Sequence, residues 1–330
     1  MADLIQPTIR TREQVERDLR RGVPMHLAPG ETAGRPTSKP EWLKVRVRYG
    51  ENFSELRNIM RERGLSTVCE QAACPNIYEC WEAREATFLA CGDLCTRRCG
   101  FCDVMTAKPQ ALDADEPAKI AEAVTLMGLK FAVVTGVARD DLDDGAASHW
   151  AAIIQAIRAA QPDCGIEVLI PDLKGRKQSP RDSLATVIAA QPDVLAHNLE
   201  TVERLHPQIR PGFGYAQSLE LLRWATELHP TQVTKSNLIA GMGETEQEMR
   251  AAMADLRAVG CDVLTIGQYL QPSVSWHLPV HRWVHPDEFA RYKDFGEQEL
   301  GFAWVESGPL VRSSYHAGKQ YRSAAARLAR

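Results

Sequence analysis

The stretch ATFLACGDLCTRRCGFC, residues 86–102, joins a strand-like apolar run to three closely spaced cysteines. Five more apolar runs follow it, and segments with helical periodicity separate them. The five runs are FAVVTGV (131–137), GIEVLIPD (165–172), VLAHNLE (194–200), VTKSNLIAG (233–241) and DVLTIGQYL (262–270). Continuous apolar strands joined through helices indicate a parallel sheet covered by helices. The pattern therefore predicts an α/β fold, either a doubly wound sheet or a complete or partial barrel.

The cysteines of CTRRCGFC (95–102) have the spacing of an iron–sulfur site. Three thiolates spaced C-x3-C-x2-C can hold three irons of a [4Fe–4S] cluster and leave the fourth iron open. An open metal position is typical of catalysis rather than of electron storage. Another triplet, the first in chain order, lies in CEQAACPNIYEC (69–80), so six of the nine cysteines fall within 34 residues. The candidate ligands are Cys95, Cys99 and Cys102 in one group and Cys69, Cys74 and Cys80 in the other.

The remaining cysteines have simpler explanations. Cys91 could extend CTRRCGFC to a closed four-ligand cluster or a zinc site, but it lies in the apolar run, where packing accounts for it. Cys164 and Cys261 also look like core residues, because no partner stands at metal spacing. Zinc in either triplet would need a histidine to complete the site. The recurring His277, His281 and His285 are interrupted by Pro279 and Pro286, so we expect a loop there rather than a helical metal face.

The composition argues against several classes of protein. The chain has 330 residues, of which 44% are hydrophobic and 25% charged, as is ordinary for a globular protein. A net charge of −4 argues against general affinity for nucleic acid. No apolar run is long enough to span a bilayer, and the N-terminus lacks the apolar segment of a signal peptide. The odd number of cysteines also argues against a disulfide framework, so we expect a cytoplasmic protein.

Polar residues at the carboxyl ends of the predicted strands are candidates for a ligand site, because those ends meet at one edge of a parallel sheet. The candidates for contacts to a bound cofactor are Thr135, Gly136, Glu167 and Asn198, and a residue as small as Gly136 lets a ligand approach the backbone. Corresponding positions hold His197, Lys235, Ser236, Gln268 and Tyr269. Glu167 and Asn198 could equally be satisfied within the protein, and both interpretations stay open at this point.

Two loops have local interpretations. GMGET (241–245) is typical of a strand-to-helix turn in which Thr245 caps the helix. The acidic loop that contains Asp140, Asp141, Asp143 and Asp144 is expected to be solvated, because no histidine stands nearby to make it a metal site.

CTRRCGFC resembles the signature of the radical S-adenosylmethionine (SAM) enzymes. CEQAACPNIYECW (69–81) and GPLVRSSYHAG (308–318) are similar to segments of the lipoyl synthase family in particular. The resemblance continues through VTGVARDDLDDGAA (134–147), LAHNLETVERLHPQIRPGFGY (195–215), TKSNLIAGMGET (234–245) and TIGQYLQPSVSWHLPVHRWVHPDEF (265–289). It extends over residues 40–320, far beyond the three cysteines. It implies a partial (β/α)6 barrel of the TIM type, with N- and C-terminal extensions that close over its mouth.

The resemblance also implies roles for individual residues. Cys95, Cys99 and Cys102 would hold the cluster whose open iron binds SAM, and one electron would cleave SAM to a 5′-deoxyadenosyl radical. Cys69, Cys74 and Cys80 would hold an auxiliary [4Fe–4S] cluster that donates sulfur. Ser314 of RSSYHA, with Ser313 as the alternative, would be the fourth ligand, and a hard oxygen ligand makes that iron easier to release. Arg312 would hydrogen-bond the serine or the cluster sulfides.

The implied activity is that of a sulfurtransferase, which inserts two sulfur atoms at C6 and C8 of an octanoyl chain carried on a lysine of a lipoyl carrier domain. The implied partners are octanoylated domains of 2-oxoacid dehydrogenase complexes or the glycine cleavage H protein, and an electron donor such as ferredoxin or flavodoxin. An iron–sulfur carrier protein would rebuild the auxiliary cluster. Three alternatives stay open: another two-cluster radical SAM sulfur-inserting enzyme, a two-cluster electron-transfer protein and a structural zinc protein.

We divide the chain into four segments. Residues 1–40 form an N-terminal arm with little core of its own, in which a short helix is expected around 12–21. Residues 41–85 carry the first cysteine triplet and the helical stretch SELRNIMRERG. Residues 86–285 form the barrel. Residues 286–330 form a C-terminal extension with a helix over 287–301, the strand-like FAWVESG (302–308) and RSSYHA.

Overall fold

A computed structural model describes residues 38–44, 50–62, 66–71, 74–273 and 276–328, so the helix expected around residues 12–21 lies outside the described part. Eight strands form one sheet in the order β1-β2-β5-β6-β7-β8-β9-β10. They are β1 (Ser66–Thr67), β2 (Thr87–Ala90), β5 (Phe131–Gly136), β6 (Gly165–Leu169), β7 (Val194–Ala196), β8 (Val233–Ala240), β9 (Val263–Gln268) and β10 (Trp304–Gly308). Every pair from β2 onward is parallel, whereas β1 is antiparallel to β2. All six predicted parallel strands are confirmed, and the strand-like FAWVESG (302–308) supplies β10 as a seventh.

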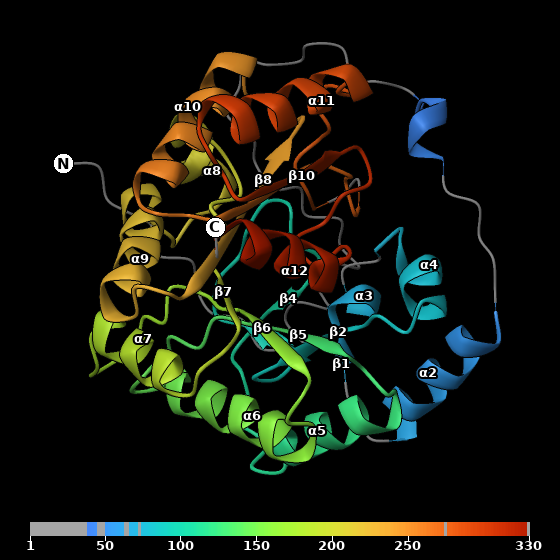
Figure 1. The fold of residues 1–330 in the computed structure, drawn as a ribbon, viewed down its shortest axis with the longest axis vertical. Coiled ribbons are helices and arrows are strands. Elements are labelled where there is room, and N and C mark those ends of the chain that lie inside the picture. Colours follow the sequence, from blue (N-terminus) through green and yellow to red (C-terminus); the bar gives the residue numbers. More distant parts are fainter. Residues whose placement is uncertain (1–37, 45–49, 63–65, 72–73, 274–275, 329–330) are drawn as a thin grey trace.

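Helices surround the sheet on its outer face (Figure 1). They are α5 (Glu116–Leu126), α6 (Ala147–Ala160), α7 (Pro180–Ala189), α9 (Tyr215–Leu228), α10 (Glu246–Ala258) and α11 (Pro286–Asp294), with the short η2 (Glu203–Leu205), α8 (His206–Ile209) and η3 (Phe295–Glu299) between them. Strand and helix alternate along the chain as predicted. Among the described strands no pairing joins β10 to β1 or β2, so the barrel is partial. None of the helices described is both long and apolar enough to cross a bilayer.

Apolar packing between the sheet and its helices explains why these segments are strands. Leu264 and Ile266 of β9 are fully buried and share one core cluster with Met249 and Met253 of α10. A strand that is covered on both faces has no solvent side, so its sequence reads as a continuous apolar run. The polar residues that interrupt these runs, such as Lys235, are therefore informative about the barrel interior.

The N-terminal extension covers the β2 side of the parallel strands, where its own β1 pairs with β2 as the edge strand. It contains η1 (Glu41–Leu43), α2 (Glu51–Glu62), α3 (Val68–Gln71) and α4 (Ile77–Glu82). The ring of Phe53 in α2 lies 5.1 Å from the ring of Trp81 in α4, between ring centroids, and Trp81 is fully buried. Phe88 of β2 belongs to the same core cluster. The helix predicted over SELRNIMRERG is confirmed as α2.

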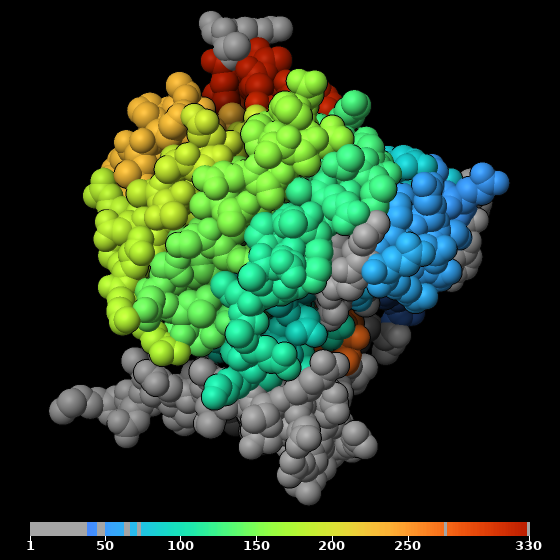
Figure 2. Space-filling view, turned by 90° about the horizontal axis from the view of Figure 1, so that it is seen from below, coloured from blue at the N-terminus to red at the C-terminus, as the bar shows by residue number. Residues whose placement is uncertain are grey.

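The C-terminal helix α12 (Ala317–Leu328) lies at the amino ends of the strands. Its Ala324 shares a core cluster with Val194, Val233 and Val263, which are the first residues of β7, β8 and β9. Figure 2 shows the red C-terminal segment at the opposite end of the molecule from the blue-green residues just after position 100. The expectation that the C-terminal extension closes the mouth is therefore wrong for α12, because its apolar face is buried at the other end of the barrel.

Candidate active site

The loop that carries the second cysteine triplet is held at the carboxyl ends of the strands. Its two ends pair as the short parallel strands β3 (Leu94–Cys95) and β4 (Met105–Thr106). The Cys95 sulfur accepts backbone N–H groups of Arg97 and of Ala138, which follows β5, each at 3.4 Å. The loop thus stands at the edge of the sheet where parallel strands place their ligands.

Cys95, Cys99 and Cys102 are free thiols. They lie close enough together that a negative charge on one raises the pKa of its neighbours. Burial raises the pKa of Cys102 to about 12, and it raises the pKa of Cys99 as well, although the charge of Arg210 opposes this. A thiol with a raised pKa keeps its proton until a metal ion replaces it. Three convergent thiols beside a cation suit the thiolate ligation and negative charge of an iron–sulfur cluster.

Arg97 ties the cysteine loop to the neighbouring strand ends. It forms ion pairs with Asp140 and, at 2.8 Å, with Asp172. Its guanidinium lies 4.2 Å from the centroid of the Phe213 ring, and Arg210 lies 3.8 Å from the same centroid. Burial alone would raise the pKa of Asp140, but the hydrogen bonds and charge of Arg97 outweigh it and hold that pKa below its ordinary value.

The acidic loop after β5 is bound within the protein rather than simply solvated. Asp141 pairs with Arg139 at 2.8 Å, and Asp144 accepts the backbone N–H of Ser148 at 2.8 Å in the first turn of α6. With Asp140 bound to Arg97, the expectation of a solvated loop is wrong for these three residues, although it holds for Asp143, which is exposed. The reason is that Arg97 and Arg139 are almost fully buried and require acidic partners.

The segment between β9 and α11 lies over the cysteine loop. Leu278 donates its backbone N–H to the carbonyl of Gly100 at 3.0 Å, and His277 Nε2 donates to the carbonyl of Cys102 at 3.0 Å. The Tyr269 hydroxyl donates to the carbonyl of Leu278 at 2.6 Å. The described residues of this segment form no helix, so the prediction that its histidines occupy a loop is confirmed. His277 restrains the cysteine loop through the backbone rather than as a metal ligand.

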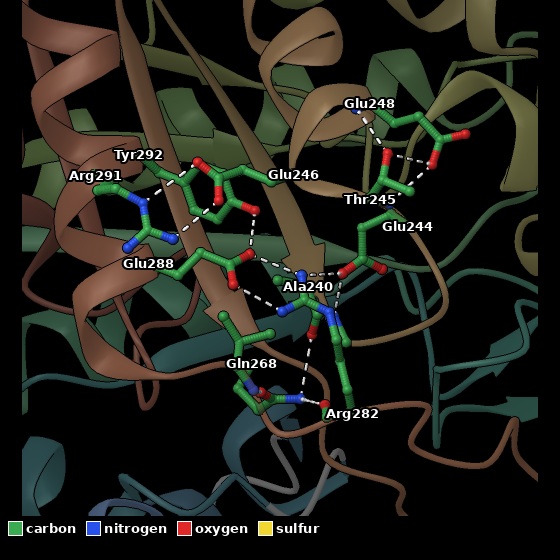
Figure 3. Close-up of polar contacts among 12 residues, drawn as sticks. Ala240, Glu244, Thr245, Glu246, Glu248, Gln268, Arg282, Glu288, Arg291 and Tyr292 are labelled. Atoms are coloured by element: carbon green, nitrogen blue, oxygen red, sulfur yellow. Dashed lines mark hydrogen bonds and ion pairs between the residues drawn. The ribbon is translucent and has the colours of Figure 1, made fainter. Parts of the chain in front are cut away.

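A buried polar network fixes the turn after β8 to that segment (Figure 3). Glu244 accepts backbone N–H groups at 2.6 and 2.9 Å, and burial raises its pKa. Gln268 Nε2 donates to the carbonyl of Arg282 at 3.1 Å, and Arg282 pairs with Glu288 at 2.7 Å. The predicted cap is confirmed, because Thr245 forms a capping box at the start of α10. These bonds hold the mouth of the barrel in one shape.

The first cysteine triplet lines a cavity of about 220 Å³ near the amino ends of β2 and β5. Cys69, Cys74 and Cys80 share this cavity with Ser314, whereas Ser313 is absent from its lining. The three cysteines are free thiols, and burial raises the pKa of Cys69 to about 11. The cavity therefore brings three sulfur donors and one hydroxyl together from segments more than 230 residues apart.

Hydrogen bonds attach the RSSYHA segment to α4. Asn76, directly before α4, donates to the carbonyl of Leu310 at 2.7 Å, and the Tyr315 hydroxyl donates to Glu79 at 3.2 Å. Arg312 lines the same cavity and donates to the carbonyl of Val311. Desolvation lowers the pKa of Arg312, and the nearby Cys74 opposes this shift. The Arg312 guanidinium has no carboxylate partner among the described residues. Together with the three thiols, it suits an anionic cluster at this position.

The two cysteine groups face opposite ends of one barrel interior. Val133 of β5 lines the cavity of the first triplet, and Ala138 donates to Cys95 of the second. These residues are five positions apart on one extended segment, which corresponds to about 16 Å at about 3.3 Å per residue. The space between the two groups is the barrel interior itself.

A buried ion pair occupies that interior. Lys235 Nζ lies 2.9 Å from both carboxylate oxygens of Glu167, and each side chain is only 1% exposed. Both oxygens of Glu167 are thus engaged within the protein. Thr135 lies in the same interior, where its hydroxyl donates to the carbonyl of Leu169 at 3.2 Å. A side chain at Gly136 would collide with Trp150 at 2.6 Å, so helix packing accounts for this glycine.

A chain of polar side chains closes the top of the interior beside the cysteine loop. Asn198 Nδ2 donates to Glu200 at 3.0 Å, and Asn237 Nδ2 donates to the other oxygen of Glu200 at 2.9 Å. Thr265 in turn donates to Asn237 at 2.8 Å. The Glu200 charge acts on Cys99 and Cys102, so this chain lies near the thiols. Asn198 Oδ1 is buried and accepts no hydrogen bond among the described residues, which leaves it available to a ligand.

The pattern of polar residues at strand ends predicts Asn198 in this group but not Glu200, Asn237 or Arg210. Glu200 and Asn237 each lie within two residues of a predicted strand-end position, so a wider window at each strand end would have included them. His197 points elsewhere: its Nδ1 donates to the carbonyl of Ile170 at 2.9 Å. Burial and the charge of Arg210 lower the pKa of His197 to about 3, so this ring is neutral.

Two protein families match the chain. The radical SAM superfamily matches residues 89–256, and the N-terminal domain of lipoyl synthase matches residues 28–74. The lipoyl synthase of Mycobacterium avium (strain 104) is 55% identical over 287 residues, which are 87% of this chain and 91% of that protein. The lipoyl synthase of Mycobacterium ulcerans (strain Agy99) is 54% identical over 289 residues, which are 88% of this chain and 87% of that protein.

Solved structures share the fold at low sequence identity. HydG, a maturase of the [FeFe]-hydrogenase, aligns with a TM-score of 0.52 at 12% identity over 89% of this chain and 66% of HydG. Streptococcus suis SuiB bound to S-adenosylmethionine aligns with a TM-score of 0.50 at 10% identity over 68% of this chain and 51% of SuiB. At such identities the likeness concerns the fold alone.

Proposed function

Because the chain belongs to the lipoyl synthase family of the radical SAM superfamily, we propose that it inserts sulfur at C6 and C8 of an octanoyl chain held on a lysine of a lipoyl carrier domain. Family membership makes it an enzyme that uses SAM and [4Fe–4S] clusters to insert sulfur for lipoate. One observation carries the finer proposal: two separate cysteine triplets face the two ends of one barrel interior. We place the enzyme in the cytoplasm, where its thiols stay reduced.

Cys95, Cys99 and Cys102 hold the cluster that binds SAM. With SAM bound, this cluster supplies the one-electron chemistry that removes hydrogen from unactivated carbon. The protein keeps the loop rigid through Arg97 and the backbone bonds to Cys95. Asn198 offers Oδ1 to a donor group of SAM, and Thr135 and Gly136 form the nearby strand end. Glu167 supports the site through Lys235, because both of its oxygens are already bound.

Cys69, Cys74, Cys80 and Ser314 would hold the auxiliary cluster, which would supply the sulfur. A serine oxygen is a harder ligand than thiolate, so it would hold its iron less firmly. Arg312 balances the negative charge of the cluster from within the same cavity. Residues 41–85 and 286–330 thus supply the auxiliary site, and residues 86–285 supply the SAM site.

The auxiliary cavity reaches the surface on the side away from the Cys95 loop. Its lining includes the exposed Lys130 and Arg322 at the amino end of the barrel. We expect an acidic face of the iron–sulfur carrier protein to dock there and rebuild the cluster, while a separate electron donor reduces the SAM cluster. Neutralising both charges, Lys130→Gln with Arg322→Gln, should slow repeated turnover with the carrier more than it slows the first turnover. Equal loss of the first turnover would contradict this docking site.

The proposed function is tested with anaerobic, cluster-loaded protein, SAM, a reductant and an octanoylated carrier domain. We expect both 5′-deoxyadenosine and lipoyl product. Cys95→Ala should abolish SAM cleavage, whereas Cys69→Ala should keep part of it and lose sulfur insertion. Cys164→Ala, a change at a buried cysteine outside both triplets, is the matched control. Absence of both products with intact clusters refutes the proposal, and product on a different acceptor favours another sulfur-inserting enzyme.

Ser314 and Ser313 form a matched pair for the fourth ligand. Ser314→Ala should change the Mössbauer signal of one auxiliary iron and stop sulfur insertion, with SAM cleavage retained. Ser313→Ala should leave both unchanged, because this residue does not line the cavity. The reverse result would make Ser313 the ligand.

A further inference from the structure

Cys91 stands apart from both cysteine triplets. It directly follows β2, it is fully buried, and its backbone φ of 66° is unusual for a residue with a side chain. The sequence alone explained it as a core residue. The fold, however, places it against the first residue of α5, Glu116, and against His149 in the first turn of α6.

Three different donor atoms meet at this point. The Cys91 sulfur, a carboxylate oxygen of Glu116 and a ring nitrogen of His149 all lie within 4.8 Å of one another. His149 Nε2 is 2.6 Å from Glu116 Oε2, and the Cys91 backbone N–H donates to the same oxygen at 2.8 Å. The side chains of His149 and Glu116 are only 9% and 12% exposed. The group is thus shielded, and it lies on a different set of elements from either triplet.

We propose that Cys91, Glu116 and His149 form a binding site for a divalent transition metal, of which zinc is the best match. Zinc prefers this mixture of sulfur, nitrogen and oxygen ligands, and three protein ligands with a water are a common zinc set. Zinc bonds of about 2.0–2.3 Å place ligand atoms about 3.3–3.7 Å apart. The His149 and Glu116 atoms need to separate by less than about 1 Å, which rotation of the two side chains supplies.

Metal binding at this site involves no change of oxidation state. The metal replaces the proton between Nε2 of His149 and Glu116, and that proton moves to Nδ1 of the ring. The Cys91 thiol proton is released to solvent, because a coordinated thiol is deprotonated. Asp144 lies nearby, but its oxygens already accept N–H groups at the start of α6, so water takes the fourth position.

The site has a structural consequence for the known chemistry. A bound metal would join the end of β2 to the first turns of α5 and α6, four residues before Cys95. It would thereby restrain the start of the cysteine loop. This inference is independent of the proposed function, because none of the three residues belongs to either triplet.

The test uses cluster-loaded protein whose iron and sulfide contents show that both triplets are filled. After incubation with zinc chloride and desalting, zinc is measured by mass spectrometry, and its surroundings by X-ray absorption at the zinc edge. We expect one zinc per chain with a single sulfur neighbour. Cys91→Ser and His149→Ala should each weaken zinc binding by at least about tenfold, since even residues behind metal ligands have effects of this size. The matched control Cys164→Ala should keep wild-type affinity.

Each alternative outcome contradicts the proposal. If the wild type binds no zinc, the site does not exist. If both variants bind zinc as tightly as the wild type, or if the zinc has three sulfur neighbours, the metal lies elsewhere. Circular dichroism and cluster content show whether a variant is folded. Cys91→Ser keeps the size of the side chain, so it separates loss of a ligand from loss of packing. An anomalous zinc peak between the three side chains in a crystal would confirm the site directly.

Discussion

The buried pair of Glu167 and Lys235 gives a prediction whose size follows from the structure. Both side chains are 1% exposed, so removing one partner leaves a charge in the barrel interior. At pH 7 an unpaired lysine can become neutral by losing its proton, which limits the cost of the buried charge to about 4.6 kcal/mol. An unpaired glutamate can become neutral by gaining a proton, which limits the cost to about 3.7 kcal/mol. Burial already raises the pKa of Glu167, so protonating it costs less than protonating an exposed glutamate.

Glu167→Leu should therefore destabilise the protein by about 3–5 kcal/mol, and Lys235→Met by somewhat less. A chain of this size loses about 2 °C of Tm or less per kcal/mol, so we expect a fall of about 5–10 °C for Glu167→Leu. The double variant should recover most of the loss, because two apolar side chains leave no unpaired charge. Anaerobic thermal unfolding followed by circular dichroism measures each step.

The control is the exposed pair of Arg181 and Glu227, whose side chains are 52% and 40% exposed. Arg181→Ala should cost less than about 1 kcal/mol. A double variant that is no more stable than Glu167→Leu would refute the reasoning. SAM cleavage by the double variant adds a functional readout: recovery shows that Glu167 acts through Lys235, and continued loss shows direct contact with SAM.

Three further changes test the site and its support. Gly136→Ala should lower stability by about 1–3 kcal/mol in thermal unfolding, because the new methyl group meets Trp150, and an unchanged Tm would contradict this packing. Asn198→Ala should raise the SAM concentration for half-maximal cleavage about tenfold, as expected for one lost buried hydrogen bond, and an unchanged value would exclude the contact. A hydrogen bond from the Arg204 side chain, and to a smaller extent one from the backbone N–H of Thr245, lowers the pKa of Glu248 to about 2. Because this folded-state pKa is depressed, the stabilisation is complete above the ordinary pKa of 4.5 and disappears as the pH falls toward 2. Glu248→Gln should therefore destabilise the protein near neutral pH but not in acid, and a difference independent of pH would oppose this account.

Much of the fold could be predicted because its signals are local. The runs at 131–137 and 233–241 are apolar since both faces of those strands are covered, and β5 and β8 lie where the runs predicted. The cysteine triplets are likewise recognisable because their members lie within a dozen residues of one another. Thr245 could be predicted as a helix cap for the same reason, since a capping box spans four residues.

No local pattern in the chain shows where the C-terminal extension lies. Only the family resemblance implied that Ser314 of RSSYHA joins Cys69, Cys74 and Cys80, and nothing local shows at which end of the barrel α12 packs. The structure decides both points, because Ala324 packs on the first residues of β7, β8 and β9, and Ser314 lines the Cys69 cavity. The loop after β5 shows the same limit, since the partners of Asp140 and Asp141 are buried arginines that the acidic sequence did not reveal.

Local patterns in the chain thus predict which segments are strands and helices and which cysteines belong together, because periodicity and ligand spacing act over a few residues. Which distant side chains meet follows from the packing of the folded chain. That packing placed the two cysteine triplets at opposite ends of one interior and joined Asn198 to Glu200 and Asn237. It also gave Cys91 two partners from α5 and α6. Such contacts depend on how whole elements pack, and packing brings together residues that are far apart in the sequence and share no local pattern that would predict their contact.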